Sequence, residues 1–224
     1  MPHAYLRGAS RRSLLLGAAA LAAALHLGLL PGRAHGAEAA QLADGRTLLE
    51  KFLSGVAGAS GAFEQETITR EGRRTGAASG EFAFLRPSKF DWQYLRPYRQ
   101  RIVGDGEMVR IYDEDLMQVT EKRMTDAAAA TPAGVLFGAG RIPADWTVAA
   151  EPGLVALSPK EAAGGFERIE VAFDAAGLPA ALGLIDAFGQ TTRIRFTRFT
   201  PGTPDEERFV LRVPQGVDVM RDAQ

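Results

Sequence analysis

The feature that most constrains the fold is a succession of short segments in which apolar and polar residues alternate. Phe90, Trp92 and Tyr94 alternate with Asp91 and Gln93, a period of two that predicts a strand with one buried face. Similar segments lie before and after it, separated by turns rich in glycine and proline. They are residues 61–69, 77–85, 100–103, 108–112, 116–120, 148–150, 154–157, 166–173, 178–185, 191–199 and 209–213. About eleven short strands without long helices between them predict a mainly β fold, an antiparallel meander that closes into a barrel or a strongly curved sheet.

Two segments carry the signals of helices instead. Within residues 41–56 the apolar residues recur at spacings of three and four, and Asp44 is placed to cap the first turn. Residues 125–140 contain four consecutive alanines, followed by Thr131 and Pro132, which are typical of a helix start. The sequence therefore predicts an N-terminal helix and a second, short helical segment inserted in the middle of the sheet.

The first 37 residues have the three parts of a secretory signal peptide. Residues 1–13 contain three arginines and no acid, residues 14–30 are almost unbroken leucine, alanine and glycine, and residues 34–37 offer small side chains for cleavage. A transmembrane anchor is the alternative, but an apolar run of about 17 residues only reaches the lower limit for spanning. Residues 10–15 also resemble a twin-arginine export signal, although paired arginines occur in ordinary signals too. We expect residues 38–224 to form one exported domain located in the periplasm.

Charge and cysteine content limit what the exported domain can be. Four of the 26 basic residues and none of the 27 acidic ones lie in residues 1–37, which leaves a net charge of about −5. Such a chain is a poor candidate for nucleic acid or for anionic membrane surfaces. The sequence has no cysteine, so it can hold neither a disulfide nor a thiolate metal site nor a lipid-modified cysteine. We expect a monomer that is free in solution.

Catalytic patterns are missing from residues 38–224. All three histidines lie within the first 37 residues, which excludes histidine-dependent triads and most zinc sites from the mature domain. The acidic run 113–115 lacks the spacing of a calcium loop and is typical of a solvated turn. Arg193, Arg195 and Arg198 form either the solvent face of an amphipathic strand, which we favour, or an anion site. We expect no enzyme, no metal and no cofactor.

Apolar side chains on the predicted strands are numerous enough to cover more than one face of a sheet. They form either an ordinary packed core beneath the first helix or the wall of a ligand cavity, and composition does not separate the two. The candidates for cargo reception and the cavity are Phe82, Phe84, Phe90, Trp92, Tyr94, Met108, Ile111, Ile169, Val171, Phe173, Ile194 and Phe196.

A motif around the clearest strand resembles a known family. The segment Phe84-Leu85-Arg86-Pro87-Ser88-Lys89-Phe90-Asp91-Trp92-Gln93-Tyr94 is similar to the outer-membrane lipoprotein carrier proteins of Gram-negative bacteria, the LolA family. Further segments agree in order along nearly the whole mature chain, among them 61–65, 80–82, 102–106, 157–160 and 214–217. The R-P-x-x-F-x-W core within the first segment is fairly specific.

The resemblance implies a half-open antiparallel barrel of eleven strands, closed by a lid of short helices over an apolar cavity. It also implies a shuttle that takes acylated lipoproteins from an inner-membrane ABC transporter to an outer-membrane receptor. Because that receptor is itself a lipoprotein, the absence of cysteine favours the soluble carrier. A related carrier or sensor of another acylated lipid remains the alternative, and a lipid hydrolase or a purely structural domain are more distant rivals.

Particular residues match positions with roles in that family. Arg86 matches an arginine that latches the lid by hydrogen bonds to lid carbonyl groups, although an arginine that fixes the turn before Pro87 is the simpler reading. Phe90 matches a position used in receiving cargo from the transporter. The lid residues are expected to be Thr131, Pro132, Val135, Leu136 and Phe137. The alanines and glycines around them depart from the family pattern and leave the lid's detailed contacts open.

Overall fold

The computed structural model describes residues 43–124, 137, 142, 146–160 and 166–221. The predicted signal segment and the lid residues Thr131, Pro132, Val135 and Leu136 lie outside this part of the chain. The description that follows concerns the described residues alone.

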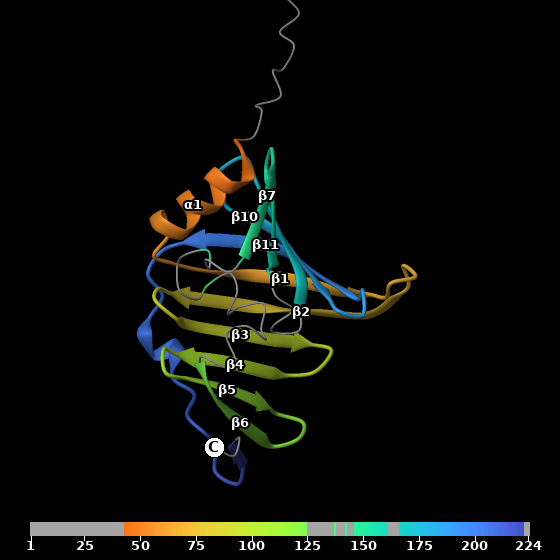
Figure 1. Cartoon of the computed structure of the whole chain (residues 1–224). Helices are drawn as coiled ribbons and strands as arrows, with labels where there is room; N and C mark the ends of the chain where they lie inside the picture. Colours follow the sequence, from red (N-terminus) through yellow and green to blue (C-terminus); the bar gives the residue numbers. More distant parts are fainter. Residues whose placement is uncertain (1–42, 125–136, 138–141, 143–145, 161–165, 222–224) are drawn as a thin grey trace, which may run out of the picture. The chain divides into compact units, whose positions relative to one another are not determined.

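The described residues form one large, open sheet (Figure 1). Its strands lie in the order β12-β6-β5-β4-β3-β2-β1-β11-β10-β9-β8-β7. Their bounds are β1 Gly58–Ile68, β2 Arg74–Leu85, β3 Lys89–Arg96, β4 Gln100–Asp105, β5 Met108–Asp113, β6 Gln118–Arg123, β7 Trp146–Glu151, β8 Leu154–Pro159, β9 Phe166–Phe173, β10 Pro179–Asp186, β11 Thr191–Pro201 and β12 Asp218–Arg221. The first and last strands of this order do not pair with each other, so the sheet does not close into a full barrel. The expected mainly β fold with an open, curved antiparallel sheet is confirmed.

The N-terminal helix α1 (Gly45–Gly55) forms where the apolar spacing predicts it. The carboxylate of Asp44 accepts hydrogen bonds from the backbone N–H groups of Arg46 and Thr47, which satisfies two donors of the first turn. The helix contacts β7, β8 and β9 at the end of the sheet (Figure 1). Its buried face includes Leu48 and Phe52, and the Phe52 ring reaches Phe199 of β11.

The C-terminal region departs from the predictions. Residues 209–213 alternate like a strand, and Phe209 and Leu211 are indeed buried while Val210 is exposed, but the segment pairs with no strand of the described sheet. Phe209 instead ends a short 3₁₀ helix, η2 (Glu206–Phe209), whose first turn is capped by the Asp205 carboxylate. Alternating burial arises here because extended chain lies flat on another surface, so the predicted strand at 209–213 is wrong.

The strand that does form near the C-terminus is β12, which the sequence did not indicate. It pairs in parallel with β6, whereas the other strand pairs are antiparallel. Its residues are mostly exposed and it spans only Asp218–Arg221, so it has no alternating apolar pattern to reveal it. The strand predicted at 116–120 also begins later, because Leu116 and Met117 lie in the exposed turn before β6.

The two faces of the sheet bury separate apolar clusters. The larger cluster lies on the inner face and gathers side chains from α1 and from nearly all strands. A smaller one on the outer face joins Val103 and Val119 to Leu211 of the C-terminal segment. Because side chains alternate along each strand, β4 and β5 contribute to both clusters, one on each side of the sheet.

Candidate functional site

Strands β2 and β3 place their aromatic side chains opposite one another on the inner face. In this antiparallel pair Phe84 lies opposite Phe90, and Phe82 lies opposite Trp92. All four side chains are at most 2% exposed. The R-P-x-x-F-x-W segment thus supplies one half of an aromatic wall, and its neighbouring strand supplies the other.

Most of the predicted cavity residues share this interior. Residues from β9 and β11, on the far half of the sheet, belong to the same buried cluster as the aromatic wall, and Ile111 packs against it from β5. The sequence prediction brought together Phe82, Phe84, Phe90, Trp92, Tyr94, Ile111, Ile169, Val171, Phe173, Ile194 and Phe196, and the structure places them in one continuous interior.

Met108 is not brought together with the others. Val109 and Ile111 belong to the inner cluster, and adjacent residues of a strand point to opposite faces. Met108 therefore lies on the outer face of β5, where it is partly buried. The prediction placed Met108 and Ile111 together, but residues three apart in a regular strand cannot share a face.

Phe137 is the residue of the expected lid that the structure describes, and it fills the aromatic wall. Its ring stacks on Phe84 with centroids 4.3 Å apart and an interplanar angle of 7°. It also stacks on Phe82 at 5.4 Å and lies 6.4 Å from Trp92. The side chain is fully buried. One side chain from the segment between β6 and β7 thus occupies the space between the rings of β2 and β3.

Several further aromatic residues of the interior were missing from the sequence prediction, among them Phe52, Phe63 and Phe199. Phe63 stacks on Trp92 with centroids 4.0 Å apart, and Phe199 packs at 5.2 Å from Phe82. Phe52 of α1 meets Phe199 edge-on at 5.8 Å. Alternation was a usable signal for Phe63. Phe199 lies three residues after Phe196 and shares its face because the register of β11 shifts opposite Ala62 and Phe63, which the sequence did not indicate.

Arg86 lies at the end of β2 where the inner wall meets α1. Its Nε donates a 3.0 Å hydrogen bond to the carbonyl oxygen of Val56, the residue that ends the helix. The guanidinium carbon lies 5.3 Å from the centroid of the Phe52 ring and 5.1 Å from that of Phe84. Burial lowers the pKa of this guanidinium from its usual value. Arg86 therefore places a charged donor group directly beside the ring on which Phe137 stacks.

A small polar group interrupts the apolar interior at the other end of β3. The hydroxyl of Tyr94 donates a 3.0 Å hydrogen bond to Oε1 of Gln65. Burial raises the pKa of the Tyr94 phenol, while the nearby indole of Trp92 and the bond to Gln65 act in the opposite direction. These groups place a hydroxyl and an amide beside the aromatic wall at the end opposite Arg86.

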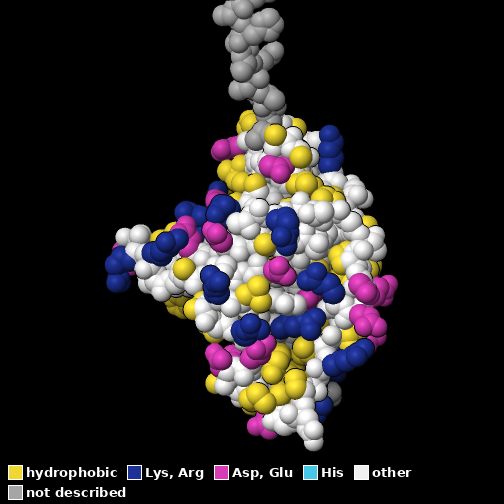
Figure 2. Space-filling model, turned by 180° about the vertical axis from the view of Figure 1, so that it is seen from behind, with side chains coloured by type: hydrophobic (Ala, Val, Ile, Leu, Met, Phe, Trp, Pro, Cys, Tyr) yellow, Lys and Arg dark blue, Asp and Glu magenta, His cyan; other side chains and the backbone are white. Residues whose placement is uncertain are grey.

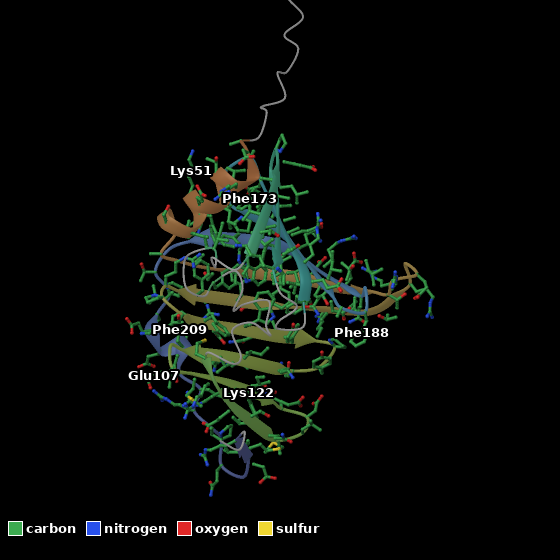
Figure 3. All side chains as sticks on the ribbon, in the orientation of Figure 1. Lys51, Glu107, Lys122, Phe173, Phe188 and Phe209 are labelled. Carbon is green, nitrogen blue, oxygen red and sulfur yellow. The ribbon has the colours of Figure 1, made fainter. Side chains whose placement is uncertain are left out.

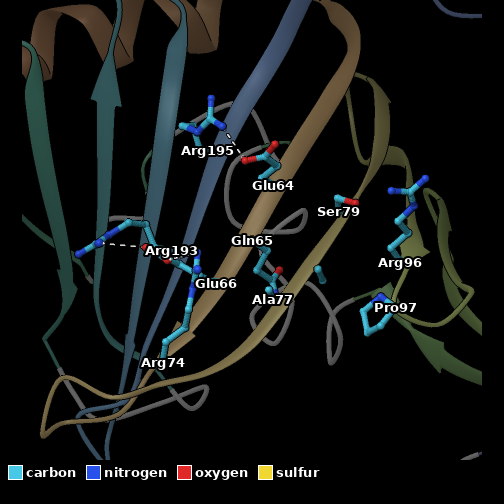
Figure 4. A pocket seen from close by; sticks show the side chains of 11 residues that line it. Glu64, Gln65, Glu66, Arg74, Ala77, Ser79, Arg96, Pro97, Arg193 and Arg195 are labelled. Atoms are coloured by element: carbon cyan, nitrogen blue, oxygen red, sulfur yellow. Dashed lines mark hydrogen bonds and ion pairs between the residues drawn. The ribbon is translucent and has the colours of Figure 1, made fainter.

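A groove lies on the outer face of the sheet. It has a volume of about 820 Å³ and crosses β11, β1, β2 and the end of β3, and charged side chains line it (Figure 4). Arg195 pairs with Glu64 at 2.6 Å, and Arg193 pairs with Glu66 at 3.1 Å. Seen from behind, basic and acidic side chains lie beside one another over the surface (Figure 2). The arginine alternation of β11 is thus a solvent face neutralised by carboxylates from β1.

The described residues contain no cluster of three or more histidine, cysteine, aspartate or glutamate side chains that could hold a metal ion. Within the same residues, no helix is both long enough and apolar enough to cross a membrane.

Comparison with known proteins decides the family. Residues 54–212 match the family model of the outer membrane lipoprotein carrier protein LolA. The chain belongs to the LolA family. The outer-membrane lipoprotein carrier protein of Bordetella pertussis is 40% identical over 178 residues, which cover 77% of this chain and 84% of that protein. The same-named protein of Cupriavidus taiwanensis is 40% identical over 182 residues, covering 77% and 86%. A solved LolA superfamily protein from Nitrosomonas europaea aligns over 75% of this chain with 7% identity and a TM-score of 0.47.

Membership of the LolA family confirms two expectations from the sequence. The chain has a carrier role toward lipoproteins, and it is not an enzyme. The matched region begins within α1 and ends just after the buried Leu211, so it includes the aromatic wall, Arg86 and the C-terminal segment up to that point.

Proposed function

We propose that this LolA-family chain is a periplasmic carrier that receives acylated lipoproteins from an inner-membrane ABC transporter and hands them to an outer-membrane receptor. The acyl chains would be held in the interior lined by the aromatic wall. The signal-like residues 1–37 support export to the periplasm. The absence of cysteine supports a carrier without a lipid anchor of its own.

The observation that carries the proposal is the position of Phe137. It enters from the chain segment expected to form the lid, and it stacks between side chains that belong to the sheet. Withdrawing this one ring would leave an apolar space bordered by Phe82, Phe84 and Trp92. An acyl chain is the kind of flexible apolar group that such a space accepts, so the cargo would replace Phe137.

The energetics of the cargo explain why a displaceable side chain is useful. Each methylene removed from water contributes about 0.8 kcal/mol, so a sixteen-carbon chain exposed to water carries a penalty on the order of 12 kcal/mol. A carrier that covered such chains completely would not release them. Because Phe137 also gains from occupying the same apolar space, its return offsets part of the affinity and favours delivery.

Arg86 is placed to link this exchange to movement of the lid. A guanidinium has five donors, and the bond to Val56 uses one of them. In our proposal other donors of Arg86 hold carbonyl groups of the lid when the interior is empty. Several moderate hydrogen bonds of this kind secure a cover that incoming cargo can still displace.

The test is transfer in a reconstituted system of transporter, carrier and receptor. We expect Arg86→Leu to accept lipoprotein but to pass far less of it to the receptor, because the closed, empty state is no longer stabilised by the latch. Arg198→Leu serves as the control, since Arg198 forms only a long, exposed pair with Glu81 on the outer face. Normal transfer by Arg86→Leu would overturn the latch role, and failure of the unmodified carrier to take up lipoprotein would overturn the proposed function.

A further inference from the structure

The indole N–H of Trp92 stands out within the interior because it is buried and unpaired. Among the described residues, Nε1 of Trp92 is the one buried side-chain nitrogen or oxygen atom without a hydrogen-bond partner. The side chain is 2% exposed, so solvent does not supply the missing acceptor. Buried polar groups are paired in the great majority of cases, and an exception needs a physical explanation.

The surroundings of this indole are almost entirely aromatic. Phe63 stacks on it at 4.0 Å, Phe82 lies at 6.0 Å, and Phe137 lies at 6.4 Å between ring centroids. None of these side chains can accept a conventional hydrogen bond. The N–H therefore belongs to the wall of the same space that Phe137 fills.

Tyr94 is a polar neighbour on the same face of β3, and it does not satisfy the indole. The Tyr94 hydroxyl gives its own proton to Gln65 at 3.0 Å. Burial raises the pKa of the phenol, and the side-chain interaction with the Trp92 indole acts to lower it. The indole N–H nevertheless meets no acceptor at hydrogen-bond geometry, so it is left without a partner while Phe137 is in place.

We infer that Trp92 Nε1 is the donor for a carbonyl oxygen of the cargo, the oxygen of an ester that joins a fatty acyl chain to its glycerol. This inference rests on the proposed function, because it requires an acyl chain in the interior. An ester carbonyl offers a good acceptor at the head of an apolar chain, and Nε1 of Trp92 is an unpaired donor among the aromatic rings of the wall. The unpaired N–H disfavours the empty, closed state, and cargo relieves it.

In this inference, Trp92 fixes how deeply the acyl chain of the cargo enters the interior. Aromatic stacking alone lets an acyl chain slide along the wall, since methylene groups are equivalent. A single hydrogen bond at the ester sets where the chain begins. Carriers with this donor distinguish ester-linked chains from ether-linked chains of the same length, because the ether lacks the carbonyl oxygen.

Binding of two matched probes tests the inference. The probes are a synthetic diacylglyceryl-cysteine peptide with ester-linked palmitoyl chains and its ether-linked analogue. The wild-type chain should bind the ester probe about five-fold more tightly, as expected for one net hydrogen bond in a protein interior. Trp92→Phe keeps an aromatic ring but removes the donor, so it should bind both probes equally. Trp146→Phe, the same change at the other tryptophan, is the matched control and should keep the preference.

A spectroscopic measurement on the wild-type chain avoids any effect of substitution on folding. The sequence has two tryptophans, Trp92 and Trp146, so ¹⁵N labelling gives two indole signals, and Trp146→Phe assigns them. The Trp92 indole proton should move downfield with the ester probe and much less with the ether probe.

The outcomes separate the inference from the function on which it rests. Equal binding of the two probes by the wild-type chain, or an ester preference that survives in Trp92→Phe, would overturn the role of Trp92 and leave the carrier function standing. Absence of binding to either probe would overturn both.

Discussion

The sheet has a cover on each of its faces, and the two covers are fastened in different ways. On the inner face, Phe137 enters among aromatic rings and makes stacking contacts. On the outer face, the cover is the C-terminal segment from η2 to β12, residues 206–221. It crosses β3–β6 and is held by ion pairs, by a buried cluster and by the pairing of β12 with β6. Figure 3 shows Phe209 of this outer cover at the edge of the sheet beside β3 and β4.

The outer cover is centred on Asp91, the buried charged side chain of the described core. Its carboxylate accepts a 2.8 Å bond from Nε of Arg101 and another from the Gln93 amide. Arg208 of η2 approaches the same carboxylate at 3.4 Å, and Arg101 also donates to the backbone carbonyl of Arg208. The network joins β3, β4 and η2, so Asp91 and Trp92, adjacent in sequence, serve opposite faces.

The difference teaches how one sheet can carry a permanent cover and a releasable one. Charged groups buried with their partners are costly to separate, because each would be left unpaired away from water. Separating stacked rings costs less free energy, provided that another apolar group takes the place of the ring that leaves. The chemistry of the fastening therefore favours an outer segment that stays in place, and it supports our proposal that Phe137 exchanges with cargo.

The largest effect is expected at the centre of the outer cover. Asp91→Ala leaves Arg101 and Arg208 without their buried partner, and breaking such a pair costs about 3–5 kcal/mol. Urea unfolding followed by fluorescence measures the loss. The control is Arg198→Ala, whose pair with Glu81 is exposed on both sides and should change the free energy of unfolding by less than about 0.5 kcal/mol. A loss for Asp91→Ala no larger than that of the control would remove the contrast between the covers.

An intermediate effect is expected at Phe137. If its ring is part of a releasable cover, Phe137→Ala should lower the free energy of unfolding by about 1 kcal/mol, whereas Phe82→Ala in the fixed wall should cost about 3–5 kcal/mol. Both residues are fully buried, so burial alone predicts equal losses. Phe137→Ala should also bind an apolar fluorescent dye more strongly than the wild type. Equal destabilisation by the two substitutions would show that Phe137 is an ordinary core residue.

The smallest effect concerns the end of the outer cover. The hydrogen bond from Arg110 to Glu121 lowers the pKa of Glu121; burial opposes this, and Arg221 of β12 adds a second bond. A lowered pKa in the folded state gives stability that is present above the unfolded value and is lost as the pH falls through the folded pKa.

Comparison of the wild type with Glu121→Gln measures this contribution. The free energy of unfolding should fall between pH 7 and pH 3 in both proteins, and the fall should be smaller in the variant by at most about 1 kcal/mol. Identical pH dependence in the two proteins would mean that Glu121 contributes nothing to the attachment of β12.

Much of the site was open to prediction because of alternation. Phe90, Trp92 and Tyr94 share a face by their spacing alone, and the structure keeps them there. Met108 was misplaced because the prediction grouped apolar residues without asking which of them lie an even number of positions apart in the strand and so share a face. Phe137 could be assigned to a lid by resemblance, but its stacking on Phe84 depends on a contact between segments far apart in the chain.

By itself, the sequence determined the local patterns: the helix capped by Asp44, the short strands and the apolar face of each, because backbone geometry fixes which residues share a side. Only the tertiary structure decided which apolar face became the aromatic interior, that residues 209–213 lie on the outer face without pairing, and that β12 joins β6. These outcomes depend on which distant surfaces meet. An alternating pattern states that a residue will be buried, but it does not name the partner that buries it.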